Sequence, residues 1–291
     1  MPSDFVLDGF LFYMQQKIIE IDSRIDCKPF LRWAGGKRWL LKEINQFMPK
    51  QGFNRYHEPF IGGGAVYFHL QPKNQAFISD LNEELINTYS FIKEDVEAVI
   101  SELKKFKNTK DEYYKVRSAK YKKEVKKAAR FIYLNQMSFN GIYRVNLKGE
   151  YNVPYGYREK YQFEYKNIRK VSQALKETII KAEDFQSLTK NVQKGDLVFL
   201  DPPYTVTHND NGFIHYNQKI FSIEDQYRLA NTIEEIKEIG AFYILTNAAH
   251  KKVREIFNNK DKTFELKRAS IIGGKNAKRG KYSELIITNT I

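Results

Sequence analysis

Short apolar runs alternate with helix-like patterns along most of the chain, and acidic, glycine or proline residues end the runs. This alternation is typical of βαβ units built around a mainly parallel sheet. It predicts strands at residues 56–60, 76–80, 178–182, 197–201, 242–247, 264–269 and 284–289. We therefore expect an α/β protein.

The clearest helical pattern spans residues 223–239. Ser222 can cap its start, Asp225 favours its first turn, and Gly240 can end it. Apolar residues with helical spacing predict one buried stripe. The stripe consists of Ile223, Tyr227, Ala230, Ile233 and Ile236.

One long stretch, residues 92–169, interrupts the alternation. Lys-rich helical segments are followed there by a Gly/Tyr/Asn-rich piece at 139–144. We interpret the stretch as a mainly helical module inserted between the second and third strands. The expected division is an N-terminal extension at 1–27, an α/β domain from 28–91 and 170–291, and the inserted module.

Composition narrows the class of protein. The 291 residues include 48 Lys and Arg and 35 Asp and Glu, which gives a net charge of +13. This charge favours a polyanionic partner, and nucleic acid is favoured over a membrane surface. A single cysteine excludes a disulfide scaffold and indicates a reducing compartment. The apolar stretch 5–14 contains Asp8 and lacks a basic start, so we expect neither a signal peptide nor a membrane span, but a cytoplasmic protein.

The positive charge is concentrated in two segments, 101–130 and 251–281, which carry +8 each while the remainder sums to −3. Surfaces that meet phosphate have this character. A solvated helix face and a plain hairpin loop are the alternatives. The five histidines have no metal-ligand spacing, so we expect no metal site.

Two glycine-rich turns and one acidic residue indicate a nucleotide-like ligand. The turns are WAGGK at 33–37 and EPFIGGG at 58–64, each followed by an apolar helical pattern. Glycines there allow close backbone approach, and a helix start offers free N–H groups. Asp80 ends the second strand, where a carboxylate can accept the ribose hydroxyls. It could equally cap the helix near Glu83, and a turn alone could be a tight connector.

The buried strand at 197–200 runs into Asp201, Pro202, Pro203 and Tyr204. Two prolines cannot continue a sheet, and they fix a stiff bend where α/β sheets bind ligands. A carboxylate and a turn carbonyl there can accept the hydrogens of an exocyclic amine, while Tyr204 stacks on the base. This chemistry suits methylation of adenine N6.

The order of these motifs resembles the Dam-type DNA adenine-N6 methyltransferases, the α-class enzymes. FLRWAGGK at 30–37, EPFIGGG and DPPY carry the likeness, as do LN at 134–135, FNG at 139–141, RVN at 144–146 and GEYNVPYG at 149–156. The resemblance covers about residues 28–290. It implies a Rossmann-like methyltransferase sheet, an inserted target-recognition module with a β-hairpin, and S-adenosyl-L-methionine (SAM) as cofactor.

The resemblance also implies residue roles. The SAM-binding residues would be Trp33, Ala34, Gly35, Lys37, Glu58, Phe60, Gly62, Gly64, Asp80, Phe185 and Asp201. The catalytic motif would be Asp201, Pro202, Pro203 and Tyr204. The DNA-binding residues would be Arg32, Phe139, Asn140, Ile142, Arg144, Asn146 and Pro154.

Within the DNA set, Phe139 resembles the aromatic wedge that fills the gap left by a flipped adenine, and Arg32 the side chain directed at the outer guanine. Phe139 could instead be a hairpin core residue, and Arg144 a phosphate contact or a surface ion pair. His208 and His215 fit loop or DNA-backbone contacts better than general bases. Cys27 lacks the context of a cytosine-methylating nucleophile.

The expected function is methylation of adenine N6 in duplex DNA by base flipping, with GATC as the favoured site. Alternatives are another short site such as GATATC, an RNA or protein-glutamine substrate, or a catalytically silent DNA-binding protein on this scaffold. We expect a monomer that binds double-stranded DNA and no membrane. The sequence leaves open whether a cognate restriction endonuclease is a partner.

Overall fold

The computed structural model describes residues 25–204, 221–258, 260–269 and 281–291. The strands are β1 (Tyr56–Glu58), β2 (Ala76–Asp80), β3 (Ile179–Ala182), β4 (Leu197–Leu200), β5 (Phe242–Ala248), β6 (Lys262–Ala269) and β7 (Lys281–Thr288). The α-helices are α2 (Ala65–Leu70), α3 (Glu83–Glu94), α4 (Val96–Leu103), α5 (Lys110–Ser118), α6 (Glu124–Met137), α7 (Tyr165–Ala174), α9 (Ile223–Ile239) and α10 (Lys251–Ile256). Short 3₁₀ turns are η1 (Lys37–Trp39), η2 (Ile44–Phe47), η3 (Phe139–Gly141) and η4 (Phe185–Lys190).

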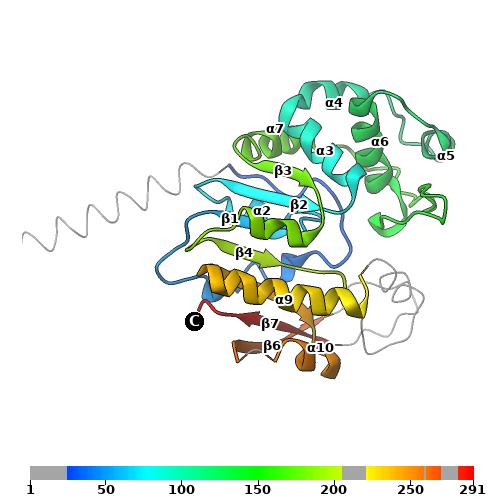
Figure 1. The fold of residues 1–291 in the computed structure, drawn as a ribbon. Coiled ribbons are helices and arrows are strands. Elements are labelled where there is room, and N and C mark those ends of the chain that lie inside the picture. The colour runs from blue at the N-terminus through cyan, green and yellow to red at the C-terminus, as the bar shows by residue number, and fades with distance from the viewer. Residues whose placement is uncertain (1–24, 205–220, 259, 270–280) are drawn as a thin grey trace, which may run out of the picture.

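The strands form one mixed sheet in the order β3-β2-β1-β4-β5-β7-β6 (Figure 1). β1 to β5 pair in parallel, and β7 is antiparallel to both of its neighbours, β5 and β6. This is the Rossmann-like methyltransferase sheet that was predicted. All seven strands lie where the apolar runs indicated, with shifts of a few residues at their ends.

Proline decides where two central strands end. β1 ends at Glu58 and β4 at Leu200, each one or two residues earlier than expected. Pro59 and the pair Pro202–Pro203 follow them, and a residue without an N–H cannot extend a ladder. The chain therefore turns off the sheet at the same edge in both places.

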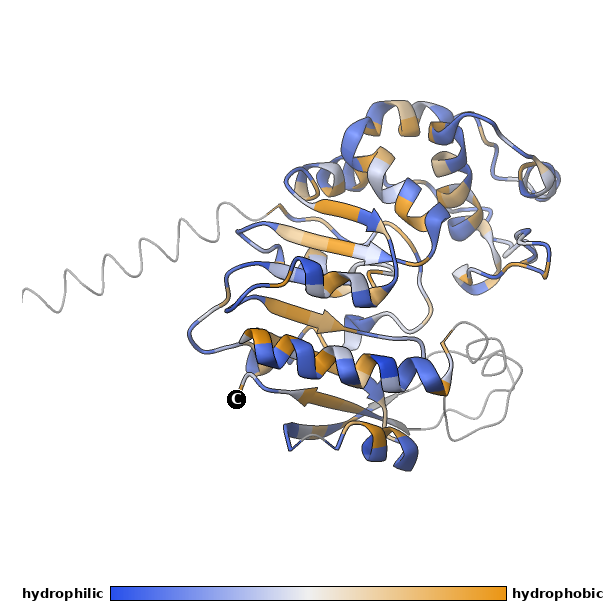
Figure 2. Cartoon of the chain, in the orientation of Figure 1, coloured by the Kyte–Doolittle hydropathy of each residue, from blue (hydrophilic) through white to orange (hydrophobic). Residues whose placement is uncertain are grey.

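Alternate side chains of the central strands enter two different cores. Val198 and Leu200 pack with α9 and α10, whereas Leu197 and Phe199 join the core on the opposite face. β4 is apolar throughout and reads as a continuous apolar run, because both of its faces are buried. β1 is buried as well but carries the polar His57 and Glu58. Helix α9 has both apolar and polar positions (Figure 2).

Helix α9 confirms the expected ends and corrects the expected stripe. Ser222 and Asp225 form a capping box, and Gly240 ends the helix at φ 83°. The prediction was wrong for Tyr227, which is 48% exposed, and for Ile223 and Ala230, which are only half-buried. Gln226, Leu229, Thr232, Ile233 and Ile236 form the buried face instead. Gln226 is buried because its side chain accepts a hydrogen bond from Asn247 on β5.

Helices α3 to α7 lie between β2 and β3 in the chain, as the interruption of the pattern predicted. In Figure 1 they gather at the β3 end of the sheet, far from β6 and β7. Their core is continuous with one face of the sheet. The expected boundary at residue 92 falls inside α3, and the division into domains stays a prediction.

Candidate active site

The site lies where the strand order reverses. β1 and β4 are neighbours, but the chain leaves β1 toward β2 on one side and β4 toward β5 on the other. The carboxyl ends of adjacent parallel strands at such a reversal form the usual ligand crevice of open α/β sheets. The loops at 59–64 and 201–204 both start there.

Asp201 is held by two side chains from other parts of the chain. Its Oδ1 lies 2.6 Å from the Nζ of Lys37 and accepts a 2.7 Å hydrogen bond from the hydroxyl of Thr246 on β5. Burial raises the pKa of this carboxyl, and the Lys37 ammonium opposes that rise. Lys37 itself is 3% exposed and also donates to the carbonyl of Gly35. A fixed, half-buried carboxylate, 18% exposed, therefore stands directly after β4.

Tyr204 contacts the same cluster from the other side. Its hydroxyl donates a 2.5 Å hydrogen bond to Oε2 of Glu284 on β7, and its ring centroid lies 4.9 Å from the Lys37 ammonium. Sequence reasoning missed both Glu284 and Thr246. The one available signal was an acidic residue at the start of an apolar strand, because a carboxylate in such a run requires a partner.

The glycine turn after β1 meets Asp80 at the end of β2. Gly62 and Gly64 have φ values of 44° and 68°, which glycine adopts without strain. The N–H of Gly62 donates to Oδ2 of Asp80 at 3.1 Å, and the N–H of Asn82 donates to Oδ1 at 3.0 Å. Burial raises the pKa of Asp80 to about 6, against these hydrogen bonds. Asp80 does not cap α3, because Asn82 occupies the N-cap.

Trp33 covers this turn. A Cβ added to Gly62 would lie 2.7 Å from the indole ring, so the ring rests directly on the backbone. On its other side Trp33 stacks with Tyr143 at 5.9 Å between centroids. Ala34 and Gly35 are exposed beside it. The predicted helix after this motif is wrong: η1 and η2 are single 3₁₀ turns.

The remaining predicted cofactor residues lie at or just after the carboxyl ends of β1 and β3. Glu58 is buried and accepts a 2.7 Å hydrogen bond from Tyr56, and burial raises its pKa to about 8. Phe60 stacks on Phe185 at 5.4 Å, and both contact Phe221. Glu58 is thus the buried last residue of β1, directly before the glycine turn, whereas the three aromatic rings form one apolar group.

The predicted DNA-binding residues divide into two groups. Arg32 is anchored by its backbone, since Asn135 accepts from its N–H at 2.8 Å and donates to its carbonyl at 2.7 Å. Its side chain packs against Gly141, where a Cβ would lie 2.5 Å away. Burial and the charge of Arg158 lower the pKa of Arg32. Arg32 thus lies against the 139–141 turn, although it is distant in sequence.

That turn projects two residues outward. Phe139 is 49% exposed, and Asn140 is exposed at φ 55°. The N–H of Phe139 donates to the carbonyl of Pro154 at 2.9 Å, which ties the turn to the far side of the hairpin. Ile142 is half-buried next to it.

The hairpin is closed by an antiparallel bridge between Val145 and Tyr151. Arg144 is exposed and donates a 2.8 Å hydrogen bond to Asn152 across it. The side chain of Asn146 accepts from the N–H groups of Lys148 and Glu150, so it shapes the hairpin tip. DNA contact by Arg144, Asn146 and Pro154 stays a prediction.

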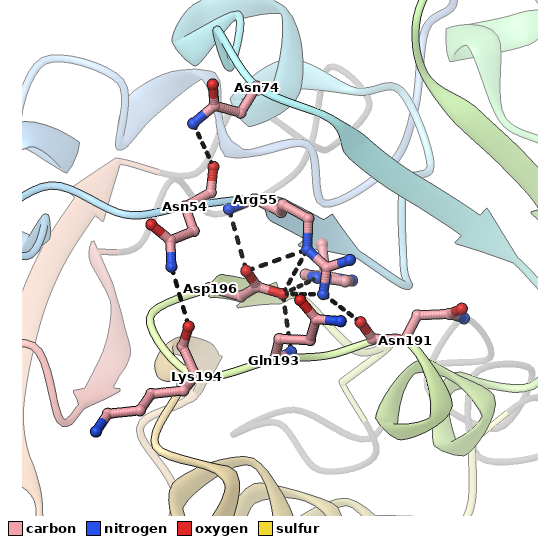
Figure 3. A network of polar contacts seen from close by, with 8 residues as sticks. Asn54, Arg55, Asn74, Asn191, Gln193, Lys194 and Asp196 are labelled. Atoms are coloured by element: carbon pink, nitrogen blue, oxygen red, sulfur yellow. Dashed lines mark hydrogen bonds and ion pairs between the residues drawn. The ribbon is translucent and has the colours of Figure 1, made fainter.

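A second polar network lies at the opposite, amino-terminal edge of β1 and β4 (Figure 3). Asp196, which is fully buried, accepts hydrogen bonds from Arg55 and from the N–H of Gln193, and it lies 2.8 Å from His57. Arg55 also donates to the carbonyl of Asn191. The network joins the starts of the two strands and contains no predicted site residue.

Some expectations concern residues outside the described part of the chain, namely His208, His215 and, within the basic segment 251–281, residues 259 and 270–280. Cys27 is described and buried, and burial raises the pKa of its thiol to about 11. A thiol in that state is a poor nucleophile at neutral pH, in line with the expectation from its context.

Comparison with known proteins identifies the class. The model of the D12 class N6 adenine-specific DNA methyltransferases matches residues 33–272. The Type II methyltransferase M1.LlaDCHI of Lactococcus lactis subsp. cremoris is 37% identical over 278 residues, covering 92% of this chain and 97% of its own. M.MjaIII of Methanocaldococcus jannaschii is 38% identical over 291 residues, covering 91% of this chain and 100% of its own. The DNA adenine methylase of Haemophilus influenzae is 32% identical over 282 residues, covering 94% and 97%.

The chain belongs to the D12 class of N6 adenine-specific DNA methyltransferases. It is thus an adenine-N6 DNA methyltransferase, and its family implies DNA as substrate and SAM as methyl donor. Among the described helices, none has both the length and the apolar character needed to cross a membrane.

Proposed function

We propose that this enzyme methylates adenine N6 within GATC in duplex DNA, and that it extrudes the target base from the helix to do so. The observation that carries the proposal is the half-buried Asp201, held by Lys37 and Thr246 beside Tyr204. The relatives named DNA adenine methylase and Type II methyltransferase support the reaction. The proposal of the GATC site rests on Arg32, Ile142, Arg144 and Pro154, and the proposal of base flipping rests on Phe139.

The crevice fits SAM. Gly62 and Gly64 leave no room for a side chain, because an added Cβ would meet Trp33 or Phe68 within 2.8 Å. Asp80 presents a carboxylate at the end of β2, where it can accept the two ribose hydroxyls. When bound there, SAM supplies an electrophilic methyl group.

The chain's own residues activate and orient the amine. The N6 lone pair of adenine is delocalised into the ring, so the nitrogen attacks poorly without help. Asp201 and the carbonyl of Pro202 accept one hydrogen bond each from the two N6 hydrogens and draw the nitrogen toward sp³ geometry. The Asp201 carboxylate also matches the positive charge that develops on N6, while Tyr204 stacks on the base and holds it in line.

Extrusion of the base is supported by the recognition turn. A stacked adenine cannot reach a site at the sheet edge, and unstacking costs a few kcal/mol, to order of magnitude. Phe139 is large, apolar and half-exposed on a turn fixed by Pro154, which suits a wedge that fills the vacated space. A residue that only completed a hairpin core would be buried.

GATC is supported by side-chain chemistry alone. Arg32 and Arg144 can each form the two hydrogen bonds that guanine O6 and N7 accept, and Ile142 and Pro154 can contact a thymine methyl. Other sites that contain GAT, such as GATATC, require much the same set. Because relatives are named Type II methyltransferases, a cognate restriction endonuclease is a candidate partner. We propose a monomer, which light scattering of the free protein and its DNA complex would check.

The test uses the full chain, SAM and a set of duplexes that differ by one base pair. We expect N6-methyladenine only in the GATC duplex, identified by mass spectrometry of the nucleosides. Methylation of GATATC but not of GATC would overturn the site, and transfer to RNA alone would overturn the DNA substrate. Asp201→Ala should abolish transfer and retain duplex binding. Near-normal turnover by this variant would refute the proposed site.

A further inference from the structure

Glu284 is an unusual residue for its position. It lies on β7, an interior strand between β5 and β6, and is 1% exposed among the buried Leu285, Ile286 and Ile287. A carboxylate in such a place is costly unless it is paired and hydrogen-bonded. Its Oε2 accepts the 2.5 Å hydrogen bond from the Tyr204 hydroxyl and lies 3.9 Å from Nζ of Lys37. Both partners belong to the candidate active site.

We propose that Glu284 is a positioning residue for methyl transfer, acting through the hydroxyl of Tyr204. This inference rests on the proposed function, in which the Tyr204 ring stacks on the target adenine. Glu284 would fix the direction of that ring and would not itself contact the base or the cofactor. No motif identified in the sequence includes it.

Tyr204 needs such an anchor because its motif fixes only the backbone. Pro202 and Pro203 restrict the main chain before the tyrosine, but rotation about its side-chain bonds is not restricted by them. The hydrogen bond ties the hydroxyl end of the ring to an interior strand of the sheet, which is a rigid support. The ring can then hold a base in line for attack, where a small misplacement lowers the rate strongly.

Lys37 connects the anchor to the reacting carboxylate. Its ammonium lies between Asp201 at 2.6 Å and Glu284 at 3.9 Å and close to the face of the Tyr204 ring. The two carboxylates, the ammonium and the phenol therefore form one cluster drawn from η1, the loop after β4, and β7, in which Lys37 and Glu284 are buried. Purely structural bracing would not require an acid here, since apolar residues of similar volume usually replace buried ion pairs without loss of stability.

The experiment compares Glu284→Ala and Glu284→Gln with the wild type on a cognate duplex. Loss of a hydrogen bond to a charged group predicts that Glu284→Ala lowers kcat by about 10- to 150-fold. The KM for DNA and the Kd for SAM should stay within about 3-fold of wild type, because binding contacts are retained. Glu284→Gln keeps an acceptor for the hydroxyl, so its kcat should stay within about 5-fold of wild type.

Two further measurements separate positioning from structural support. With 2-aminopurine at the target position, Glu284→Ala should leave the extruded base less stacked and therefore more fluorescent than the wild type does. In the Tyr204→Phe background, Glu284→Ala should cause little additional loss of kcat, because the shared hydrogen bond is already absent. Glu265→Gln is the matched control: this exposed carboxylate on β6 pairs in register with Leu285, and its removal should leave the kinetics unchanged.

The inference is overturned if the kcat of folded Glu284→Ala stays within about 2-fold of wild type. It is also overturned if the fold-loss of kcat in the double variant equals the product of the losses caused by Glu284→Ala and Tyr204→Phe alone. Should Glu284→Ala fail to fold, Glu284→Gln decides: unchanged fluorescence together with a large loss of kcat would refute positioning through Tyr204. A wild-type protein that methylates no adenine would instead refute the proposed function. An inactive Asp201→Ala beside normal Glu284 variants would refute this inference alone.

Discussion

Replacing Gly62 by alanine tests the contact between Gly62 and Trp33 in the proposed cofactor crevice. The new Cβ would stand 2.7 Å from two atoms of the Trp33 indole, closer than real Cβ contacts, at a residue whose φ is 44°. An L-residue in the left-handed region costs about 1–2 kcal/mol, and overpacking costs about 1–3 kcal/mol more. The total of roughly 2–5 kcal/mol is below the 5–15 kcal/mol that stabilises a typical domain, so the variant should fold.

Gly52→Ala is the matched control, because φ is 79° there and nothing lies within 4 Å of the added Cβ. It should lose only the backbone cost of about 1–2 kcal/mol and bind SAM as the wild type does. Gly62→Ala should lose more stability than this control. It should also bind SAM at least ~10-fold more weakly, since any displacement of the turn disturbs the hydrogen bond from Gly62 to Asp80. Urea unfolding and titration calorimetry measure the two effects.

The reasoning fails if Gly62→Ala matches Gly52→Ala in stability and keeps wild-type affinity for SAM. A second check uses the indole itself. Trp33→Ala removes the clash, so it should destabilise Gly62→Ala by less than it destabilises the wild type. Equal losses in the two backgrounds would show that the indole does not rest on the glycine.

Asp196→Ala should lower the free energy of unfolding by about 3–5 kcal/mol, because it breaks a buried charge network; a loss below about 1 kcal/mol in urea would contradict this. Burial alone would raise the pKa of Asp196, but hydrogen bonds from Arg55 and its neighbours lower it overall. The stabilisation by the Asp196 carboxylate is therefore present above about pH 4, the pKa of an unfolded aspartate, and disappears as the pH falls through the lower pKa of the folded state. Phe139→Ala should change stability by less than about 0.5 kcal/mol yet suppress the 2-aminopurine signal of base flipping, whereas a large loss of stability would identify a core residue. Because the pKa of Asp80 is raised to about 6, SAM affinity measured by calorimetry should fall as the pH drops below that value, and Asp80→Asn should bind weakly without this dependence.

The position of β4 could be predicted because it is apolar on both faces, and the ends of β1 and β4 because residues that cannot pair follow them. Pro59 and Pro202 mark such ends by chemistry alone. The face of α9 was harder to predict. Gln226 is buried and accepts a hydrogen bond from Asn247 on β5. A hydrophobic pattern does not predict burial of such a polar residue.

The candidate site shows the same limit. Asp201 and Asp80 were identifiable since each directly follows or ends a strand beside a turn motif. Thr246 and Glu284 were not, because their roles arise only when β5 and β7 pair and carry them to the end of β4. Asn135 likewise gains its role by holding the backbone of Arg32 across more than a hundred residues.

The position of β7 has a consequence for how the enzyme acquires activity as it folds. The reaction centre joins Lys37, near the first described residues, to Glu284 near the last. Contacts of such long range form slowly, because a large loop must close before they are gained. The contacts among α3 to α6 all lie within residues 83–137, so they close much shorter loops and can form earlier. A nascent or partly unfolded chain would therefore be able to assemble the proposed recognition surface while it still lacks the proposed reaction centre, and methylation would begin only when the last interior strand is in place.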